Sequence, residues 1–240
     1  MEYANILIER RMREAKARKV LDIGCGIGGS LVYLSSRTDA VLYGITVSPV
    51  QRDIGCTYIR QAGCGHRCTI IEGDYLAAVP QLDEEKLFDF TFAIESFLHM
   101  KSADSFFART KNLLADGGQV LILDDFLEKG PGDLSRSADT AGYLDRFKRG
   151  WQVKNLISVE ETVERARGHG FTEVERMDLS PFLELRRPRD RIIRLILVLF
   201  GRMSLRSPFW LNMYGGDALQ QLLLKKIVGY HFLRFVKRDG

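Results

Sequence analysis

The sequence is short of cysteine, of long apolar runs and of net charge, and each shortage excludes a class of protein. Four cysteines among 240 residues are too few for the disulfide framework of a secreted protein, and residues 1–20 are charged throughout, unlike a signal peptide. The longest apolar run, Ile192–Phe200, is interrupted by Arg194 and falls well short of the roughly 20 residues that span a bilayer. A cytoplasmic protein that does not cross a membrane is therefore expected.

The positive charge is small in total but concentrated in one segment. A net charge of +4 is too mild to predict binding to nucleic acid, and none is expected. Between Arg186 and Arg206, however, seven arginines accompany a single acidic residue, Asp190, so this segment alone carries +6. The rest of the chain is slightly acidic, and the basic character belongs to this one segment.

Segments typical of strands and helices alternate along the chain and predict an α/β fold. Helices are expected at residues 5–18, 30–37, 49–62, 101–115, 144–149 and 159–168. Strands are expected at Lys19–Ile23, Ala40–Thr46, Cys68–Glu72, Leu87–Ile94, Gln119–Asp124, Thr172–Asp178 and Tyr230–Lys237. Such alternation predicts a parallel sheet covered by helices on both faces. We expect one domain over residues 1–240, with an apolar and basic insertion at residues 180–226.

A glycine-rich turn follows the first predicted strand. Gly24, Gly26 and Gly29 satisfy the G-x-G-x-x-G spacing of dinucleotide-binding proteins, in which glycines let a ligand approach the backbone. A nicotinamide-binding protein also needs an acidic residue at the end of the second strand, where this chain has Thr46. Asp22 instead creates the pattern D-x-G-x-G-x-G, which resembles motif I of the class I S-adenosylmethionine-dependent methyltransferases.

Three further segments sharpen this resemblance. The segment Gly44–Gln51 (GITVSPVQ) is similar to one in the tocopherol methyltransferases and, more loosely, in the sterol and cyclopropane-fatty-acid synthase methyltransferases. Ile71–Tyr75 (IEGDY) and Ala93–Met100 (AIESFLHM) resemble the next two elements of the tocopherol type. The resemblance implies a Rossmann-like, doubly wound, mostly parallel seven-stranded sheet with an antiparallel last strand and a helical, acceptor-binding insertion.

The same resemblance implies which residues contact the cofactor, S-adenosyl-L-methionine, and its product S-adenosylhomocysteine. The glycines pack against the amino-acid part of the cofactor and Asp22 orders the loop around its amino group. Three residues, Thr46, Ser48 and Gln51, match the positions that contact the ribose and adenine. Asp74 matches the residue that receives the adenine amino group, and Tyr75 would cover the adenine ring. The full set expected is Asp22, Gly24, Cys25, Gly26, Thr46, Ser48, Gln51, Asp74, Tyr75 and Ile94.

Three residues are candidates for the acceptor side. Glu95 and His99 are four residues apart and would share one face if the segment is helical; either could remove a proton from the acceptor. The alternative is a solvent-exposed carboxylate and a histidine that caps a helix. Tyr214, in a segment (NMYGG) that resembles one in tocopherol-type enzymes, is the third candidate. Cys64-Gly-His-Arg-Cys68 does not complete the four ligands of a structural zinc site, so no metal is expected.

The sequence predicts a methyltransferase for a small, largely apolar metabolite of isoprenoid, lipid or other secondary-metabolic origin, with carbon methylation slightly favoured. The insertion would form a hydrophobic lid, while its arginines at residues 186–206 suggest an anionic group of the substrate or a peripheral membrane contact. Alternatively, its apolar residues form a helical core or a homodimer interface. Two other functions stay open: a nicotinamide-dependent oxidoreductase, and a membrane-associated binding protein that has lost activity.

Overall fold

The computed structural model describes residues 2–84, 87–128, 138–185, 187–200 and 207–238, which divide into two compact units. Unit 1 comprises residues 1–124, 163–177 and 232–240, and unit 2 comprises residues 125–162 and 178–231. Unit 2 contains the predicted insertion together with residues 125–162, which the strand and helix pattern assigns to the main domain.

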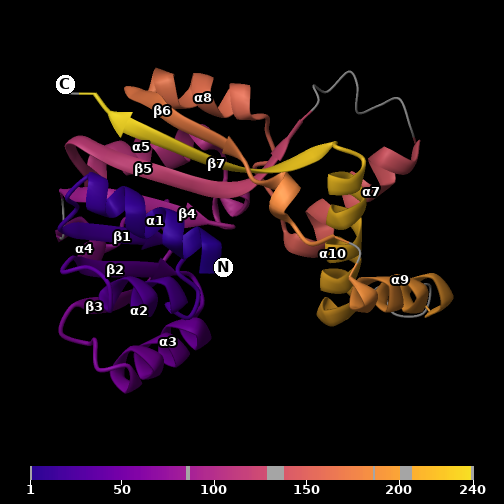
Figure 1. The fold of residues 1–240 in the computed structure, drawn as a ribbon, viewed down its shortest axis with the longest axis horizontal. Coiled ribbons are helices and arrows are strands. Elements are labelled where there is room, and N and C mark those ends of the chain that lie inside the picture. The colour runs from indigo at the N-terminus through magenta and orange to yellow at the C-terminus, as the bar shows by residue number, and fades with distance from the viewer. Residues whose placement is uncertain (1, 85–86, 129–137, 186, 201–206, 239–240) are drawn as a thin grey trace. The chain divides into compact units, whose positions relative to one another are not determined.

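A seven-stranded sheet organises the described part of the chain (Figure 1). The strand order is β3-β2-β1-β4-β5-β7-β6. The strands are β1 (Lys19–Ile23), β2 (Val41–Thr46), β3 (Cys68–Glu72), β4 (Phe88–Ile94), β5 (Leu114–Leu127), β6 (Phe171–Asp178) and β7 (Val228–Lys237). All seven predicted strands are therefore present, and the bounds of β1 and β3 agree with the prediction.

The direction of the strands confirms the predicted fold class. Strands β3, β2, β1, β4 and β5 pair in parallel. Strand β7 is antiparallel to β5. Lys237, near the end of β7, donates to the carbonyl of Leu114 at the start of β5 (2.7 Å), and Arg234, earlier in β7, donates to the side chain of Gln119, later in β5 (3.1 Å). The sheet is thus mostly parallel with an antiparallel last strand, as expected.

One predicted boundary is wrong. The helix expected at residues 101–115 ends at Leu113 as α5 (Ala103–Leu113), and Asp116-Gly117-Gly118, which precede the expected strand, belong to β5. Gly117 has φ of 71°, and the pairing of β4 with β5 shifts register between Phe88 and Phe90. The two glycines therefore form an irregular start of a strand, where a left-handed backbone favours glycine.

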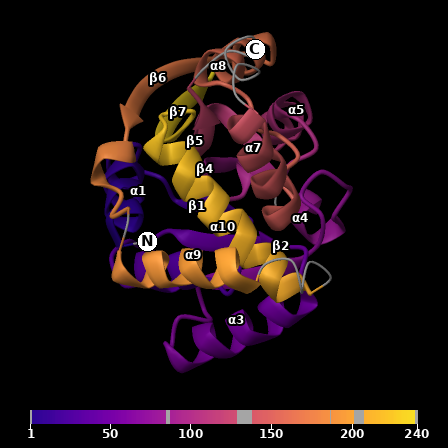
Figure 2. The same ribbon diagram turned by 90° about the vertical axis from the view of Figure 1, so that its right-hand side faces the viewer.

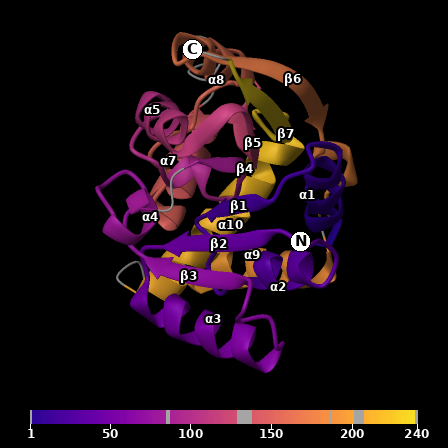
Figure 3. The same cartoon turned by 90° about the vertical axis from the view of Figure 1, so that its left-hand side faces the viewer.

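Helices flank the sheet of unit 1 on both sides. Figures 2 and 3 show α1 (Glu2–Glu14) on one side and α4 (Pro80–Glu84) and α5 on the other. The remaining helices of this part of the chain are α2 (Gly29–Ser35), α3 (Pro49–Gln61) and α8 (Val159–Gly168). The side chain of Ser48 caps α3, because its hydroxyl accepts the N–H of Gln51 (3.3 Å). The short helix α4 was not predicted.

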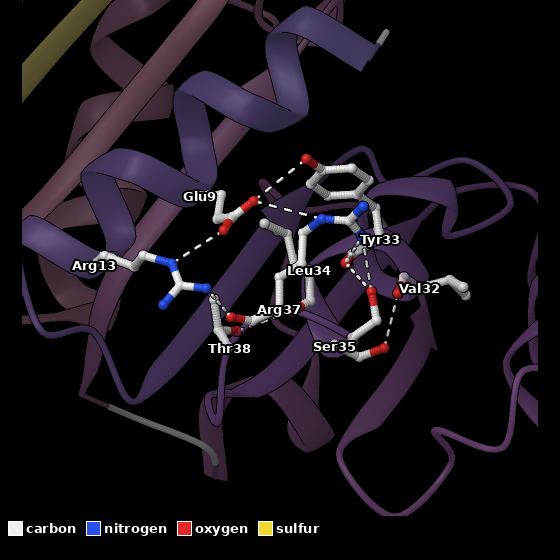
Figure 4. Close-up of polar contacts among 9 residues, drawn as sticks. Glu9, Arg13, Val32, Tyr33, Leu34, Ser35, Arg37 and Thr38 are labelled. Carbon is white, nitrogen blue, oxygen red and sulfur yellow. Dashed lines mark hydrogen bonds and ion pairs between the residues drawn. The ribbon is translucent and has the colours of Figure 1, made fainter.

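A polar cluster fastens α1 to α2 (Figure 4). Glu9 of α1 accepts a hydrogen bond from the hydroxyl of Tyr33 (3.3 Å) and pairs with Arg13 (3.0 Å) and Arg37 (3.7 Å). The guanidinium of Arg37 also lies 3.9 Å from the centre of the Tyr33 ring, a cation–π contact. Because α2 begins at the glycine-rich turn, this cluster supports the helix that carries the turn.

Phenylalanine dominates the core between the sheet and α5. Phe97 and Phe107 are fully buried; Phe97 meets Phe106 edge-to-face at 5.0 Å, and Phe107 meets Phe235 at 5.4 Å. Phe97 lies in the loop that follows β4. The core therefore anchors this loop, which carries the predicted residues Glu95 and His99.

Unit 2 is built around two closely packed helices, α7 (Ala138–Trp151) and α10 (Pro208–Leu224), with α9 (Pro188–Phe200) beside α10. A Cβ on Gly150 of α7 would lie 2.5 Å from the carbonyl of Leu211 and 2.6 Å from the Cα of Gly215, so the two backbones touch at glycines. The indole of Trp151 donates to the carbonyl of Asn212 (3.3 Å) at the same crossing. The glycine of the NMYGG segment therefore has a packing role.

Candidate functional site

The predicted site residues of unit 1 gather at one edge of the sheet. Because β1, β2, β3 and β4 are parallel, their carboxyl ends share this edge, and the loop after each strand contributes to it. Ligands of open α/β sheets bind in this position. The cluster comprises Asp22, Gly24, Cys25, Gly26, Thr46, Ser48, Gln51, Asp74, Ile94, Glu95 and His99, all in unit 1.

The loop after β1 has a backbone that glycine favours. Gly24, Gly26 and Gly28 have φ of 80°, 54° and 75°, values that other residues rarely adopt. The N–H groups of Gly24 and Cys25 both donate to the carbonyl of Ile45 in β2 (3.0 Å each), whereas the N–H of Gly26 has no acceptor among the described residues. The loop is thus tied to the sheet at its start and offers open backbone N–H beyond it.

Cys25 points its side chain back toward the sheet. A Cβ on Gly44 of β2 would come within 2.6 Å of the Cys25 sulfur, so the thiol lies over this glycine. Burial raises the pKa of the Cys25 thiol, helped by the nearby carboxyl of Asp22. The Cys25 N–H is donated to Ile45 and its carbonyl accepts the N–H of Gly28 (2.9 Å), so only this carbonyl, which can accept a second hydrogen bond, is a candidate for ligand contact, and the thiol is not.

Asp22, in β1, is a buried carboxyl without a partner. Only 3% of the residue is exposed; its backbone pairs with β2 and β4, but its carboxyl makes no hydrogen bond or ion pair with another described residue. Burial raises its pKa from 3.8 to about 8, because no positive charge or donor stabilises the ionised form. Buried carboxyls are ordinarily paired, so this one indicates a ligand group that is cationic or donates hydrogen bonds.

The polar residues after β2 form one hydrogen-bonded turn. Thr46 donates its hydroxyl to the side-chain oxygen of Gln51 (2.8 Å) and accepts the N–H of Ser48 (3.3 Å). Thr46 is buried, whereas Gln51 is exposed, and the side-chain oxygen of Gln51 is the atom engaged in this bond. The turn therefore orients Gln51, whose amide is the group available to a ligand.

Asp74 and Tyr75 follow β3 but face opposite environments. Asp74 is exposed; one carboxylate oxygen accepts the N–H of Leu76 (3.0 Å), which leaves the other oxygen for a ligand. Tyr75 is only 3% exposed, its hydroxyl lies 2.8 Å from that of Thr110, and burial raises its pKa. The expectation that Tyr75 covers a ligand ring is not supported by this position, because its ring packs against Phe106 in the core.

The loop after β4 does not meet the condition under which Glu95 and His99 would share a helical face. Glu95 has φ of 51°, and a short 3₁₀ helix, Phe97–His99, begins only after it, so Glu95 and His99 do not share an α-helical face. Both side chains are nevertheless exposed, whereas Phe97 and the two residues beside it are buried. The Glu95 N–H donates to the carbonyl of Leu123 (2.9 Å), which holds the residue in this strained conformation.

Two residues that shape the site were missed by the sequence interpretation. The Ser96 hydroxyl donates to the carbonyl of Ile23, and a Cβ on Gly24 would lie 2.5 Å from the Ser96 Cβ. Asp124, buried within β5 three residues before the strand ends, accepts the N–H of Leu98 (3.0 Å) and so positions the loop after β4. Ser96 and Asp124 could each be seen near a predicted strand end in the sequence. Their hydrogen-bond partners are more than 20 positions away, so no local pattern indicated their roles.

The third acceptor-side candidate lies in unit 2. The Tyr214 hydroxyl donates to the carbonyl of Leu197, which joins α10 to α9 (3.3 Å). Both residues of this contact belong to unit 2, and the catalytic role predicted for Tyr214 stays a prediction.

The cysteines of the Cys64-Gly-His-Arg-Cys68 segment have structural surroundings. Cys64 and Cys68 are buried in unit 1, where their thiols lie against the carbonyls of Ile59 and Leu31. In the described ranges, no group of three or more histidine, cysteine or acidic side chains is placed to hold a metal ion. Over the same ranges, every helix is too short or too polar to cross a membrane.

Comparisons with known proteins define the class. Residues 20–118 match the model of a methyltransferase domain. The chain is 28% identical over 211 residues to a probable chloroplastic tocopherol O-methyltransferase of Oryza sativa, covering 88% of this chain and 57% of that protein. It is 32% identical over 170 residues to methyltransferase GfsG of Streptomyces halstedii, and the match covers 71% of this chain and 58% of that protein. The chain thus spans little more than half of these relatives.

A solved structure has the same fold. A putative sarcosine dimethylglycine methyltransferase of Galdieria sulphuraria superimposes with a TM-score of 0.76 over 99% of this chain and 86% of that one, at 18% identity. The match of residues 20–118 to a methyltransferase domain agrees with the class that the glycine-rich turn predicted. Within that class, the chain resembles the tocopherol and sterol methyltransferases, which confirms the resemblance drawn from its motifs.

Proposed function

We propose that the chain is an S-adenosyl-L-methionine-dependent methyltransferase that acts on a small molecule. The observation that carries the proposal is the buried, unpartnered carboxyl of Asp22 beneath an open glycine-rich loop. An α-ammonium group would supply the positive charge and the donors that this carboxyl lacks. Solved methyltransferases of similar fold contain S-adenosyl-L-methionine or S-adenosylhomocysteine.

The residues of unit 1 fit the three parts of this cofactor. The amino-acid part of the cofactor would be held by Asp22 and by the backbone of Gly24, Cys25 and Gly26. The amide of Gln51 would hold the ribose. Asp74 and the backbone of Ile94 would hold the adenine. When bound, the cofactor supplies an electrophilic methyl group. The protein's tasks are to align the acceptor with that group, to exclude water and to remove a proton where the acceptor carries one.

The acceptor class rests on sequence and on the names of relatives. The apolar insertion and the similarity to tocopherol and sterol methyltransferases support a largely apolar acceptor of isoprenoid, lipid or other secondary-metabolic origin. The relatives' names cover methyl transfer to oxygen, carbon and nitrogen, so the preference for carbon stays a prediction. The cytoplasmic location stays a prediction as well, since two of these relatives are described as chloroplastic.

Titration of S-adenosylhomocysteine into the purified chain tests the proposal. We expect binding that Gly26→Ala weakens at least tenfold, because a side chain there enters the space above the loop. Gly63→Ala is the matched control: Gly63 also has positive φ (70°) and nothing within 4 Å of an added Cβ, but lies outside the site. Equal weakening by both variants, or binding of NAD(H) in place of S-adenosylhomocysteine, would overturn the proposal.

Binding should also release a proton near neutral pH. The Asp22 pKa of about 8 means that the free protein carries a protonated carboxyl at pH 7, and a bound ammonium group favours the ionised form. The affinity should therefore fall by up to about tenfold for each pH unit below 8. Isothermal titration in two buffers of different ionisation enthalpy would show close to one proton released at pH 7 and almost none at pH 9. An affinity that is constant between pH 6 and 8 would contradict this role of Asp22.

A further inference from the structure

Helix α9 of unit 2 exposes apolar and basic side chains on the same face. Ile192 and Leu195 are 58% and 59% exposed, although isoleucine and leucine are normally buried. The opposite side of the helix contacts α10: Leu197 is 5% exposed, and its carbonyl accepts the hydroxyl of Tyr214 (3.3 Å). At 100° per residue, Ile192 and Leu195 lie about 140° and 160° from Leu197, on the outward face.

Arginines flank this apolar stripe on both sides. Arg189 is the i−3 neighbour of Ile192, and Arg191 is the i−4 neighbour of Leu195, so each adjoins the stripe on the helix surface. Arg189 is 74% exposed, and Arg191 is exposed as well. The single acid of the helix, Asp190, is only 9% exposed; it accepts the N–H of Arg187 (3.1 Å) and pairs with the guanidinium of Arg189 (3.5 Å), which offsets part of that arginine's charge. The outward face is therefore apolar and positively charged.

The segments next to α9 are also apolar and positively charged. Phe209, at the start of α10, is 66% exposed. In the sequence, Arg186–Arg206 carries seven arginines and one acid, in a chain whose total charge is only +4. Figures 1 and 2 show α9 crossing α10, so that one long side of α9 within unit 2 is turned away from its neighbour.

We propose that the outward face of α9 docks on an anionic lipid surface. An amphipathic helix with aliphatic residues on one face and arginines along its borders lies in the plane of a bilayer interface, where the aliphatic side chains enter the headgroup region and the arginines meet phosphates. Charge complementarity favours this occupant over a second copy of the chain, because two copies meeting through this face would place their arginines against each other. The docking is independent of the proposed methyl transfer, since it uses none of the site residues of unit 1.

Co-sedimentation with vesicles, without cofactor, tests the proposal. We expect the chain to bind vesicles of phosphatidylcholine and phosphatidylglycerol more tightly than vesicles of phosphatidylcholine alone, and to be released by salt. Arg189→Gln with Arg191→Gln should weaken binding about 25-fold, at about fivefold for each arginine. Arg194 is left in place because its charge also acts on the half-buried Asp217. Ile192→Asn with Leu195→Asn should weaken binding at least tenfold.

Matched variants control for the loss of charge and of apolar area. Arg149→Gln removes an equally exposed arginine (76%) from α7, and Ile54→Asn removes an apolar side chain that is 50% exposed on α3. Both should bind vesicles like the wild type, with unchanged circular dichroism for all variants.

Three outcomes would overturn the proposal. The first is an absence of wild-type binding to anionic vesicles, and the second is equal binding by the α9 variants and their controls. The third is a dimer in sedimentation analysis that the Ile192→Asn, Leu195→Asn variant dissociates without any vesicle binding, which would make this face an interface between copies. None of these results would alter the cofactor titration, so the two proposals fail separately.

Discussion

Replacing Asp22 by Asn should stabilise the free protein while it weakens cofactor binding by at least about 100-fold. The carboxyl is buried and unpartnered, and its pKa of about 8 exceeds the 3.8 of an exposed aspartate. The folded protein therefore binds a proton more tightly than the unfolded chain does. Stability from this group is present below pH 4 and is lost as the pH rises toward 8. The neutral amide of Asn removes this loss but cannot neutralise an ammonium group.

Thermal unfolding and titration measure the two effects of Asp22→Asn together. At pH 8 the free energy of unfolding should rise by on the order of 2–4 kcal/mol, and the midpoint by about 5 °C or more. At pH 5 the difference from wild type should be much smaller, because both proteins then carry a neutral side chain. S-adenosylhomocysteine should raise the midpoint of the wild type but not that of the variant.

Asp89→Asn is the matched control at the opposite end of β1. The carboxylate of Asp89 accepts the N–H groups of Arg18 (2.7 Å) and Lys19 (2.8 Å), so it is a partnered acid of the same strand region. Its amide variant should be less stable than wild type, or equal to it, and should bind cofactor normally. A loss of stability in Asp22→Asn would show that the carboxyl is already satisfied in the free protein.

Replacing Glu95 or His99 should lower turnover by about 10²–10⁴-fold without weakening cofactor binding. Both side chains are exposed at the carboxyl edge of the sheet, beside the proposed cofactor residues, while buried Phe97 and Leu98 fix the loop that carries them. An exposed pair of this kind can reach a proton on the acceptor. The positive φ of Glu95 adds to the argument, because strained residues cluster at functional sites.

The measurement requires an acceptor, which incubation with labelled-methyl cofactor and a metabolite extract, followed by mass spectrometry, would identify. With that acceptor, Glu95→Gln and His99→Asn should lower kcat and remove one limb of the pH profile. His66→Asn, which changes an exposed histidine outside the site, is the control. Turnover within threefold of wild type for both variants would exclude a catalytic role and leave the pair as surface residues.

Short, local patterns account for most of what the sequence predicted. The bounds of β1 and β3, the start of α3 at Pro49 and the glycine-rich turn each depend on a few consecutive residues whose backbone preferences agree. The parallel order then follows from the alternation of strands and helices, and it brings the four predicted motifs to one edge. Local patterns and strand order are therefore sufficient to locate the candidate site.

Side-chain environment depends on partners that are distant in the sequence, and there the tertiary structure was required. Tyr75 is adjacent to Asp74, yet contact with Thr110 places it in the core. Glu95 takes a left-handed conformation because Leu123 and the buried residues after Glu95 hold it, which no helical periodicity shows. The sequence by itself determined where the glycine-rich turn forms and which edge of the sheet carries the candidate site. Only the tertiary structure showed that Asp22 is buried without a partner, because desolvation depends on everything packed around a group.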